Sequence, residues 1–170
     1  MTRPVVNIAD IEFQSRAAPV PAPAAATYEA RFARIGALVG ARQLGYDITA
    51  VPPGKRAFPR HSHRVNEEMF FVLQGTGEIR IGDETYALRA GDVVACPPGG
   101  PETAHQIANT GEEELRYLAV STQRAPEIWE YPDSGKFGVI AEYAAPGAAP
   151  APAFPHFGLL GAGVGYWEGE

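Results

Sequence analysis

The residues best suited to chemistry are two histidines and a carboxylate in the segment HSHRVNEEMFFVLQG, residues 61–75. His61 and His63 are two positions apart, so on an extended segment their side chains point to the same face. Glu68 follows after four intervening residues, at the start of a β-type run that ends at Gly75. Imidazole nitrogens and a carboxylate oxygen on one face suit a divalent transition metal. The segment therefore predicts a metal site.

A third histidine, His105, follows a loop rich in glycine and proline and opens another predicted strand. Histidines on two strands together with a carboxylate strengthen the prediction of a metal site. The fourth histidine, His156, lies in a proline-rich tail, and we do not expect it to be a ligand. The single cysteine, Cys96, ends an apolar strand just before Pro97, so we expect a small buried side chain there rather than a thiolate ligand.

Composition limits the class of protein and its partners. A chain of 170 residues, 45% of them apolar, can bury one hydrophobic core but not two large ones. The net charge of −6, without any basic run, argues against nucleic acid or an anionic membrane as a partner. A single cysteine fits a reducing compartment. No signal-peptide pattern and no stretch of 18 apolar residues is present, so we expect a cytoplasmic protein.

The sequence consists mainly of short β-type runs, with turn residues every 8 to 12 positions. It contains no convincing amphipathic helix. This pattern predicts an all-β sandwich or barrel. Two or three strands are expected within residues 28–51. Further strands are expected over 69–73, 78–81, 85–88, 93–96, 105–109 and 115–121.

The chain divides into three predicted parts. Residues 1–27 form an N-terminal arm, in which the alternating prolines of 19–26 predict an extended spacer. The arm either wraps its own domain or a neighbouring subunit, or is a loose leader. Residues 28–125 form the barrel, and residues 126–170 form a C-terminal extension. In that extension we expect a loop over 130–138, an Ala/Pro linker over 144–155, and an apolar end that docks on the barrel or on a partner subunit.

Two short motifs in this chain are similar to those that define the cupin superfamily. The first motif corresponds here to Gly54, His61, His63, Glu68 and Gly75, and the second to Gly91, Pro97, Gly99, His105 and Asn109. The resemblance covers roughly residues 45–121. Two spacings depart from the family pattern: Gly54 lies one position farther from His61 than usual, and five residues rather than two separate Gly99 from His105. Both changes are in loops, which tolerate variation in length.

The resemblance implies a jelly-roll barrel, also called a double-stranded β-helix, with one divalent metal bound inside it. The implied ligands are His61, His63, Glu68 and His105, and the ion can be Fe, Mn, Ni, Co or Zn. Glu67 competes with Glu68 for the carboxylate position. Only Glu68 leaves six residues before the motif glycine, and its face of the strand would direct Phe70 and Val72 into the barrel.

The resemblance also implies a range of functions. One hypothesis is a metal-dependent enzyme that acts on a small oxygenated molecule by dioxygenase or sugar-isomerase-like chemistry, with catalytic residues that the sequence does not identify. The alternative is a non-catalytic cupin that binds or senses a small molecule. Because cupin barrels commonly pair through edge strands and arms, we predict a homodimer with residues 1–27 near the interface.

Overall fold

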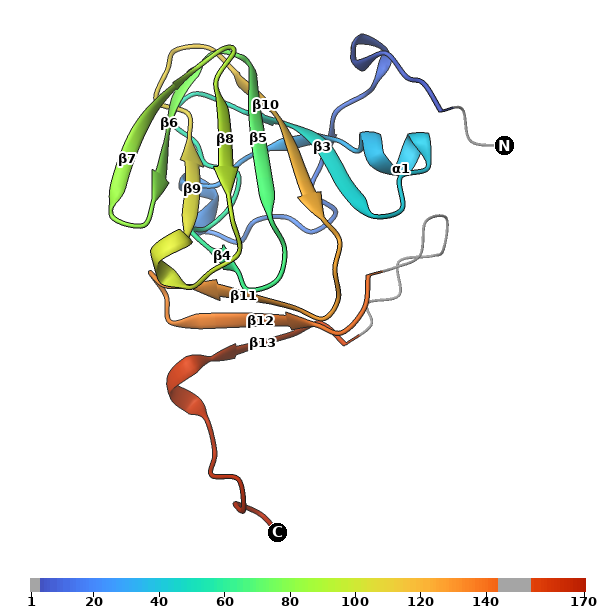
Figure 1. The fold of residues 1–170 in the computed structure, drawn as a ribbon. Helices are drawn as coiled ribbons and strands as arrows, with labels where there is room; N and C mark the ends of the chain where they lie inside the picture. Colours follow the sequence, from blue (N-terminus) through green and yellow to red (C-terminus); the bar gives the residue numbers. More distant parts are fainter. Residues whose placement is uncertain (1–3, 144–153) are drawn as a thin grey trace.

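The fold was analysed in a computed structural model that describes residues 4–143 and 154–170. The chain is built almost entirely from antiparallel strands, which form two walls around a common core (Figure 1). Among the described residues, no helix is long and apolar enough to cross a membrane. The predicted all-β jelly-roll architecture is confirmed.

The first wall is a six-stranded antiparallel sheet that carries Glu68 at one strand end. Its strands, in spatial order, are β1 (Gln14–Ser15), β2 (Arg31–Ala33), β3 (Leu44–Val51), β10 (Leu115–Thr122), β5 (Glu68–Gln74) and β8 (Val93–Cys96). The central strand β10 pairs with β3 on one side and β5 on the other, so segments far apart in sequence become neighbours.

The second wall consists of two smaller sheets. One contains β7 (Glu84–Arg89), β6 (Thr76–Ile81) and β9 (His105–Ala108). The other contains β13 (His156–Leu159), β12 (Lys136–Ile140), β11 (Glu127–Tyr131) and β4 (Ser62–His63). An antiparallel bridge between His61 and His105 joins the two sheets, so the wall continues from β4 to β9.

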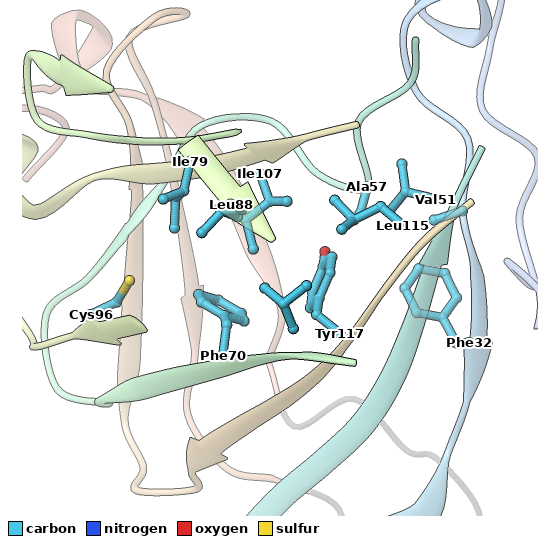
Figure 2. Close-up of a cluster of buried hydrophobic side chains, with 12 residues drawn as sticks. Phe32, Val51, Ala57, Phe70, Ile79, Leu88, Cys96, Ile107, Leu115 and Tyr117 are labelled. Atoms are coloured by element: carbon cyan, nitrogen blue, oxygen red, sulfur yellow. The ribbon is translucent and has the colours of Figure 1, made fainter. Parts of the chain in front are cut away.

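The main core lies between the walls and contains apolar side chains from both (Figure 2). In β5 the alternation of the strand directs Phe70 and Val72 inward, where both are buried, as predicted. The strand β6 contributes Ile79 from the opposite wall, and β9 contributes Ile107. Cys96 is a member of this cluster, which confirms that it is a buried side chain.

A second, smaller core covers the outer face of the six-stranded sheet. Ile48 of β3 packs there with Ala33 and Ile35, and the arm residues Val6, Ile11 and Phe13 are partly buried against them. The arm also contributes the short strand β1, which pairs with β2. Within this chain, this part of the arm therefore lies on its own domain.

The N-terminal third differs from the prediction in its helical content. Two strands, β2 and β3, lie within 28–51 as predicted, but the helix α1 (Ile35–Val39) connects them and ends at Gly40, which has a φ of +78°. Short 3-10 helices complete the fold: η1 (Ile8–Asp10), η2 (Ala24–Ala26), η3 (Pro101–Thr103) and η4 (Leu160–Ala162). The turn η2 lies inside the segment 19–26, which is therefore not extended throughout.

The C-terminal region also differs from the prediction. The prediction of a loop over 130–138 is wrong. There β11 and β12 form an antiparallel hairpin around a turn at 132–135, and β11 also pairs with β4. The boundary between barrel and extension near residue 125 stays a prediction. Most of the expected linker over 144–155 lies outside the described residues.

The apolar end of the chain adds β13 to the edge of β12, and the tail beyond it leads away from the barrel (Figure 1). Its large side chains are between 57% and 87% exposed: Phe157, Leu159, Leu160, Tyr166 and Trp167. Phe157 of β13 nevertheless stacks on Trp129 of β11, with ring centroids 6.4 Å apart, so β13 packs on the hairpin, whereas Leu160, Tyr166 and Trp167 beyond it stay exposed. Docking on a partner subunit stays a prediction.

Gly75 marks the turn from β5 to β6, where the backbone has a φ of +80°. A Cβ atom at this position would lie 2.7 Å from the carbonyl oxygen of Glu114. Both the left-handed conformation and the close approach of the neighbouring backbone require glycine.

Asn109 holds together the loops near the Gly75 turn through its side chain. Its side chain is buried, and its Nδ2 donates to the carbonyl oxygens of Val51, at 2.7 Å, and Glu113, at 2.8 Å. Its Oδ1 accepts a hydrogen bond from the backbone N–H of Gly111 at 2.9 Å. The asparagine of the second motif therefore serves the fold rather than the metal site.

Substitution Asn109→Ala is expected to lower the free energy of unfolding by about 2–4 kcal/mol, because it removes the side-chain partner of the buried Val51 carbonyl, of the Glu113 carbonyl and of the Gly111 N–H. Chemical denaturation of the variant and wild type measures the loss. Gln106→Ala, which removes one exposed hydrogen bond to Phe58, is the control and should cost less than about 1 kcal/mol. Equal stability losses in the two variants would contradict this assignment.

Candidate metal centre

Four side chains from both walls converge at one end of the barrel interior. His61 and His63 come from the segment of β4, His105 begins β9, and Glu68 begins β5 on the facing wall. One ligand-type atom from each lies within 4.8 Å of the others. The structure thus brings together all four residues that the sequence predicted as metal ligands.

The position of two of these histidines is fixed by the backbone. The N–H of His61 donates to the carbonyl of His105 at 3.1 Å, and the N–H of His105 donates back at 2.8 Å. Residues that pair directly across two antiparallel strands have adjacent side chains. The centroids of the His61 and His105 rings accordingly lie 4.9 Å apart, and the centroids of the His61 and His63 rings lie 5.1 Å apart.

Each histidine presents its Nδ1 to an oxygen that accepts a hydrogen bond: a backbone carbonyl for His61 and His105, and an ionised carboxylate for His63. His61 Nδ1 is 2.8 Å from the carbonyl of Pro59, and His105 Nδ1 is 3.4 Å from that of Thr103. His63 Nδ1 is 3.3 Å from a carboxylate oxygen of Glu127. These partners place the proton on Nδ1, so in a neutral ring Nε2 carries the lone pair.

Glu68 occupies the centre of the cluster. Its Oε2 is 2.9 Å from His105 Nε2 and 3.3 Å from His63 Nε2. Burial alone would raise the pKa of this carboxyl, but the contact with His105 and the nearby charge of His63 outweigh burial and hold the pKa well below its usual range. Glu68 is therefore ionised at neutral pH.

The histidines differ in their affinity for protons. Burial and the neighbouring His105 lower the pKa of His61 to about 4, so its ring is neutral at pH 7. Burial also acts to lower the pKa of His63, but the carboxylates of Glu127 and Glu68 outweigh it and raise that pKa to about 9. The surroundings of His63 therefore favour a positive charge, which a proton or a metal cation can supply.

The donor set fits a divalent transition metal. His63 Nε2 is buried and, within the described parts of the chain, has no hydrogen-bond partner, although Glu68 lies close to it. An orphaned imidazole nitrogen facing a carboxylate and two other imidazoles is the environment of a metal ligand. Three nitrogens and one oxygen suit several first-row ions and do not select one.

The other sequence candidates lie outside the cluster. Glu67, the alternative to Glu68, is exposed to solvent. His156 lies on β13 and is also exposed. Burial, reinforced by the charge of Glu68, raises the pKa of the Cys96 thiol to about 12, so this sulfur is protonated at neutral pH and is not an available thiolate.

A cavity of about 950 Å³ adjoins the cluster, which forms part of its wall. Its polar lining includes an ion pair between Arg34 and Asp47 at 3.7 Å, and the phenol groups of Tyr117 and Tyr143. Burial raises the pKa of both phenols, that of Tyr143 to about 12. The cavity is large enough for a small molecule and supplies both charged and uncharged hydrogen-bonding groups.

Three residues of the site were missed by the sequence analysis because they follow the expected end of the barrel. Glu127 contacts His63, and Tyr143 lines the cavity. The ring of Tyr131 stacks on that of His61, with their centroids 6.0 Å apart. The run EIWEY followed by the turn residues PDSG is a hairpin signal that would have placed Glu127 and Tyr131 on a strand.

Comparisons with known proteins agree with this geometry. The model of the cupin domain family matches residues 47–121. An oxalate-binding protein from Thermotoga maritima is 33% identical over 70 residues, which are 41% of this chain and 54% of that protein. The chain spans about half the length of the curated relatives it matches.

Two solved structures share the fold over most of the chain. A sugar phosphate isomerase of the cupin superfamily from Silicibacter pomeroyi covers 94% of both chains with a TM-score of 0.76 at 22% identity. A putative sugar phosphate isomerase from Acidithiobacillus ferrooxidans covers 79% of this chain and 78% of its own, with a TM-score of 0.68 at 24% identity. The family match, the shared fold and the histidine–glutamate cluster lead to one conclusion: residues 47–121 of this chain form a cupin domain.

Proposed function

We propose that this protein binds one divalent transition metal through the Nε2 atoms of His61, His63 and His105 and the carboxylate of Glu68. The observation that carries the proposal is the convergence of these four donors, with His63 Nε2 buried and lacking a hydrogen-bond partner among the described residues. The proton on each Nδ1 leaves Nε2 available to the ion. Iron, manganese, nickel, cobalt and zinc all accept this donor set.

We further propose that the site acts on a small oxygenated molecule held in the adjoining cavity. A bound divalent ion supplies Lewis-acid chemistry, or redox chemistry in the case of iron or manganese. The cavity residues bind and orient the molecule: the Arg34–Asp47 pair on one side, and the hydroxyl of Tyr143 close to the cluster. The Tyr143 hydroxyl accepts a hydrogen bond from Asn66 Nδ2 at 3.1 Å, so its own proton is free for the bound molecule.

The reaction type is either an isomerisation or an oxygenation. The names of the two structural neighbours favour a sugar-isomerase-like reaction, although likeness at this level of identity extends only to the fold. The alternative is binding without turnover. It is favoured by the high pKa of the cavity phenols, because a phenol that stays protonated at neutral pH is a poor general base.

A homodimer is the proposed assembly, with the N-terminal arm at its interface. The arm packs Val6 and Phe13 inward but leaves Val5 and Ile8 exposed, at 67% and 48%. Exposed aliphatic side chains on a segment fixed to the sheet are suited to pack against a second copy. A cytoplasmic location, in keeping with the single cysteine, stays a prediction.

The metal site is tested with His61→Ala and His105→Ala, each of which removes one nitrogen donor. We expect elemental analysis after gel filtration to find about one metal per chain in the wild type and a clear loss in both variants. His156→Ala, which removes an exposed histidine outside the cluster, is the matched control and should retain the metal. Full occupancy in both cluster variants would refute the site.

The cavity is tested with Ala119→Phe, which places a large side chain in its wall without touching a ligand. In cobalt-loaded wild type we expect oxalate or glucose 6-phosphate to change the visible d–d absorption, because an oxygen donor enters the coordination sphere. The variant should keep one cobalt per chain and lose this change. The control is Ala95→Phe at an exposed position of β8, which should respond like the wild type. If neither probe alters the wild-type spectrum, the proposed ligand class is wrong.

Oxygen consumption with each probe separates the two reaction types, because an oxygenase consumes dioxygen in proportion to product and an isomerase consumes none. Turnover without oxygen uptake would assign isomerisation. Binding without any turnover would assign the non-catalytic role.

The dimer is tested with the double substitution Val5→Glu and Ile8→Glu, since charges at a packed interface disfavour association. We expect light scattering to give a dimer mass for wild type and a monomer mass for the variant. Val93→Glu, at a residue that is also 67% exposed but lies on β8, should remain dimeric. A wild-type monomer, or a dimer in all three proteins, would exclude the arm as the interface.

A further inference from the structure

Glu127, the first residue of β11, is a fully buried carboxylate outside both histidine motifs. Its Oε1 accepts hydrogen bonds from the backbone N–H groups of Arg64 and Val65, each at 3.1 Å, and of Ile128 at 2.8 Å. Its Oε2 accepts from the backbone N–H of Asn66 at 2.9 Å and from Asn66 Nδ2. A buried carboxylate with hydrogen bonds from five donors has a fixed orientation.

The charge of this carboxylate is stabilised where it lies. Its two oxygens receive hydrogen bonds from four backbone N–H groups and one side-chain amide, and an environment of donors stabilises the ionised form of a carboxyl group. Glu127 is therefore an anion at neutral pH, and an anion can only accept hydrogen bonds. One of its oxygens, Oε2, also faces the ring of His63.

His63 differs from the other two histidines in the origin of its Nδ1 partner. His61 and His105 each turn Nδ1 toward the backbone carbonyl two residues earlier, at Pro59 and Thr103. His63 instead turns Nδ1 toward Glu127 Oε2 at 3.3 Å, which belongs to a strand 64 residues later in the chain. Its orientation therefore depends on a remote element, whereas the other two rings are oriented by their own loops.

The pairing of β11 with β4 explains why this carboxylate reaches the histidine. Trp129 lies opposite His63 and Glu130 opposite Ser62 in the register of the two strands. Glu127 therefore lies beyond the end of β4, where the chain turns through 64–66 toward β5. In that turn the carboxylate contacts three successive backbone N–H groups and the imidazole together.

We propose that Glu127 is a positioning residue for the metal site: it holds His63 in the Nδ1–H form with Nε2 directed at the ion. The proposal rests on the proposed metal site and adds to it a residue from outside the matched family region, 47–121. A carboxylate behind a metal-bound histidine fixes the ring and increases the basicity of the ligating nitrogen. The site would then have two carboxylates near the divalent ion, one as a ligand and one behind a ligand.

A purely structural role would also use the contacts of Glu127 with the 64–66 turn, so the test must separate the two roles. Glu127→Gln has almost the same shape and removes the charge. Glu130→Gln is the matched control, since Glu130 is also buried on β11 but pairs with Arg64 and, in the described part of the chain, forms no hydrogen bond or ion pair with the three histidines. Both variants are first compared with wild type by thermal unfolding.

The first measurement uses nuclear magnetic resonance of 15N-histidine-labelled protein without metal. In wild type and Glu130→Gln we expect a low-field His63 Nδ1 proton that exchanges slowly with solvent, because it is buried and bonded to a carboxylate. In Glu127→Gln this proton should move upfield and exchange faster. A wild-type His63 without a proton on Nδ1 would overturn the proposal, even if the variant failed to fold.

The second measurement is zinc affinity, determined by competition with a chelator. We expect Glu127→Gln to bind zinc roughly 10- to 100-fold more weakly than wild type, while Glu130→Gln stays within about 3-fold of it. In zinc-loaded wild type, the 15N shifts should place the metal on His63 Nε2. Wild-type zinc binding with unchanged affinity in Glu127→Gln refutes only the role of Glu127, whereas a wild type that binds no zinc, manganese or cobalt refutes the metal site itself.

Discussion

The pairing of His61 with His105 is the constraint on which the site depends. Each residue donates its backbone N–H to the carbonyl of the other, and this bridge joins the two sheets of one wall. The two imidazoles are adjacent because the strands are in register at this point, so their spacing is a property of the backbone. Glu68 reaches them from the facing wall, whose own register is set by the long pairing of β5 with β10.

Electrostatics explains why this end of the barrel differs from the rest of the interior. The main core is apolar, and every polar group placed beside it must find a partner or a compensating charge. The partly buried Glu68 and the fully buried Glu127 are two anions that share His63 as a neighbour. Their combined charge favours a cation between them, which is consistent with the raised pKa of His63 and with the proposed divalent ion.

The sequence predicted the cluster well because the relevant pattern is local. Two histidines two positions apart on a strand must share a face, and the apolar residues Phe70 and Val72 fixed which glutamate points inward. The hairpin of β11 and β12 could not be predicted in the same way. In β11 the buried residues are Glu127 and Glu130, whereas Ile128 is exposed, so the usual link between hydrophobicity and burial is reversed. A rule based on apolar alternation therefore interprets this strand as a loop.

That reversal has a functional explanation. Burying a carboxylate in a strand is unfavourable unless hydrogen bonds or charges compensate it, and Glu127 finds both in the turn after β4 and in His63. The motif residues thus provide the donor atoms, while the segment after the family match provides groups around them, including Tyr131 against His61 and Tyr143 in the cavity. Because the ligands alone suit many ions and reactions, differences among proteins of this fold must come from such surrounding groups. The chemistry that we propose for this protein is therefore to be sought in residues 127–143 as much as in the histidines themselves.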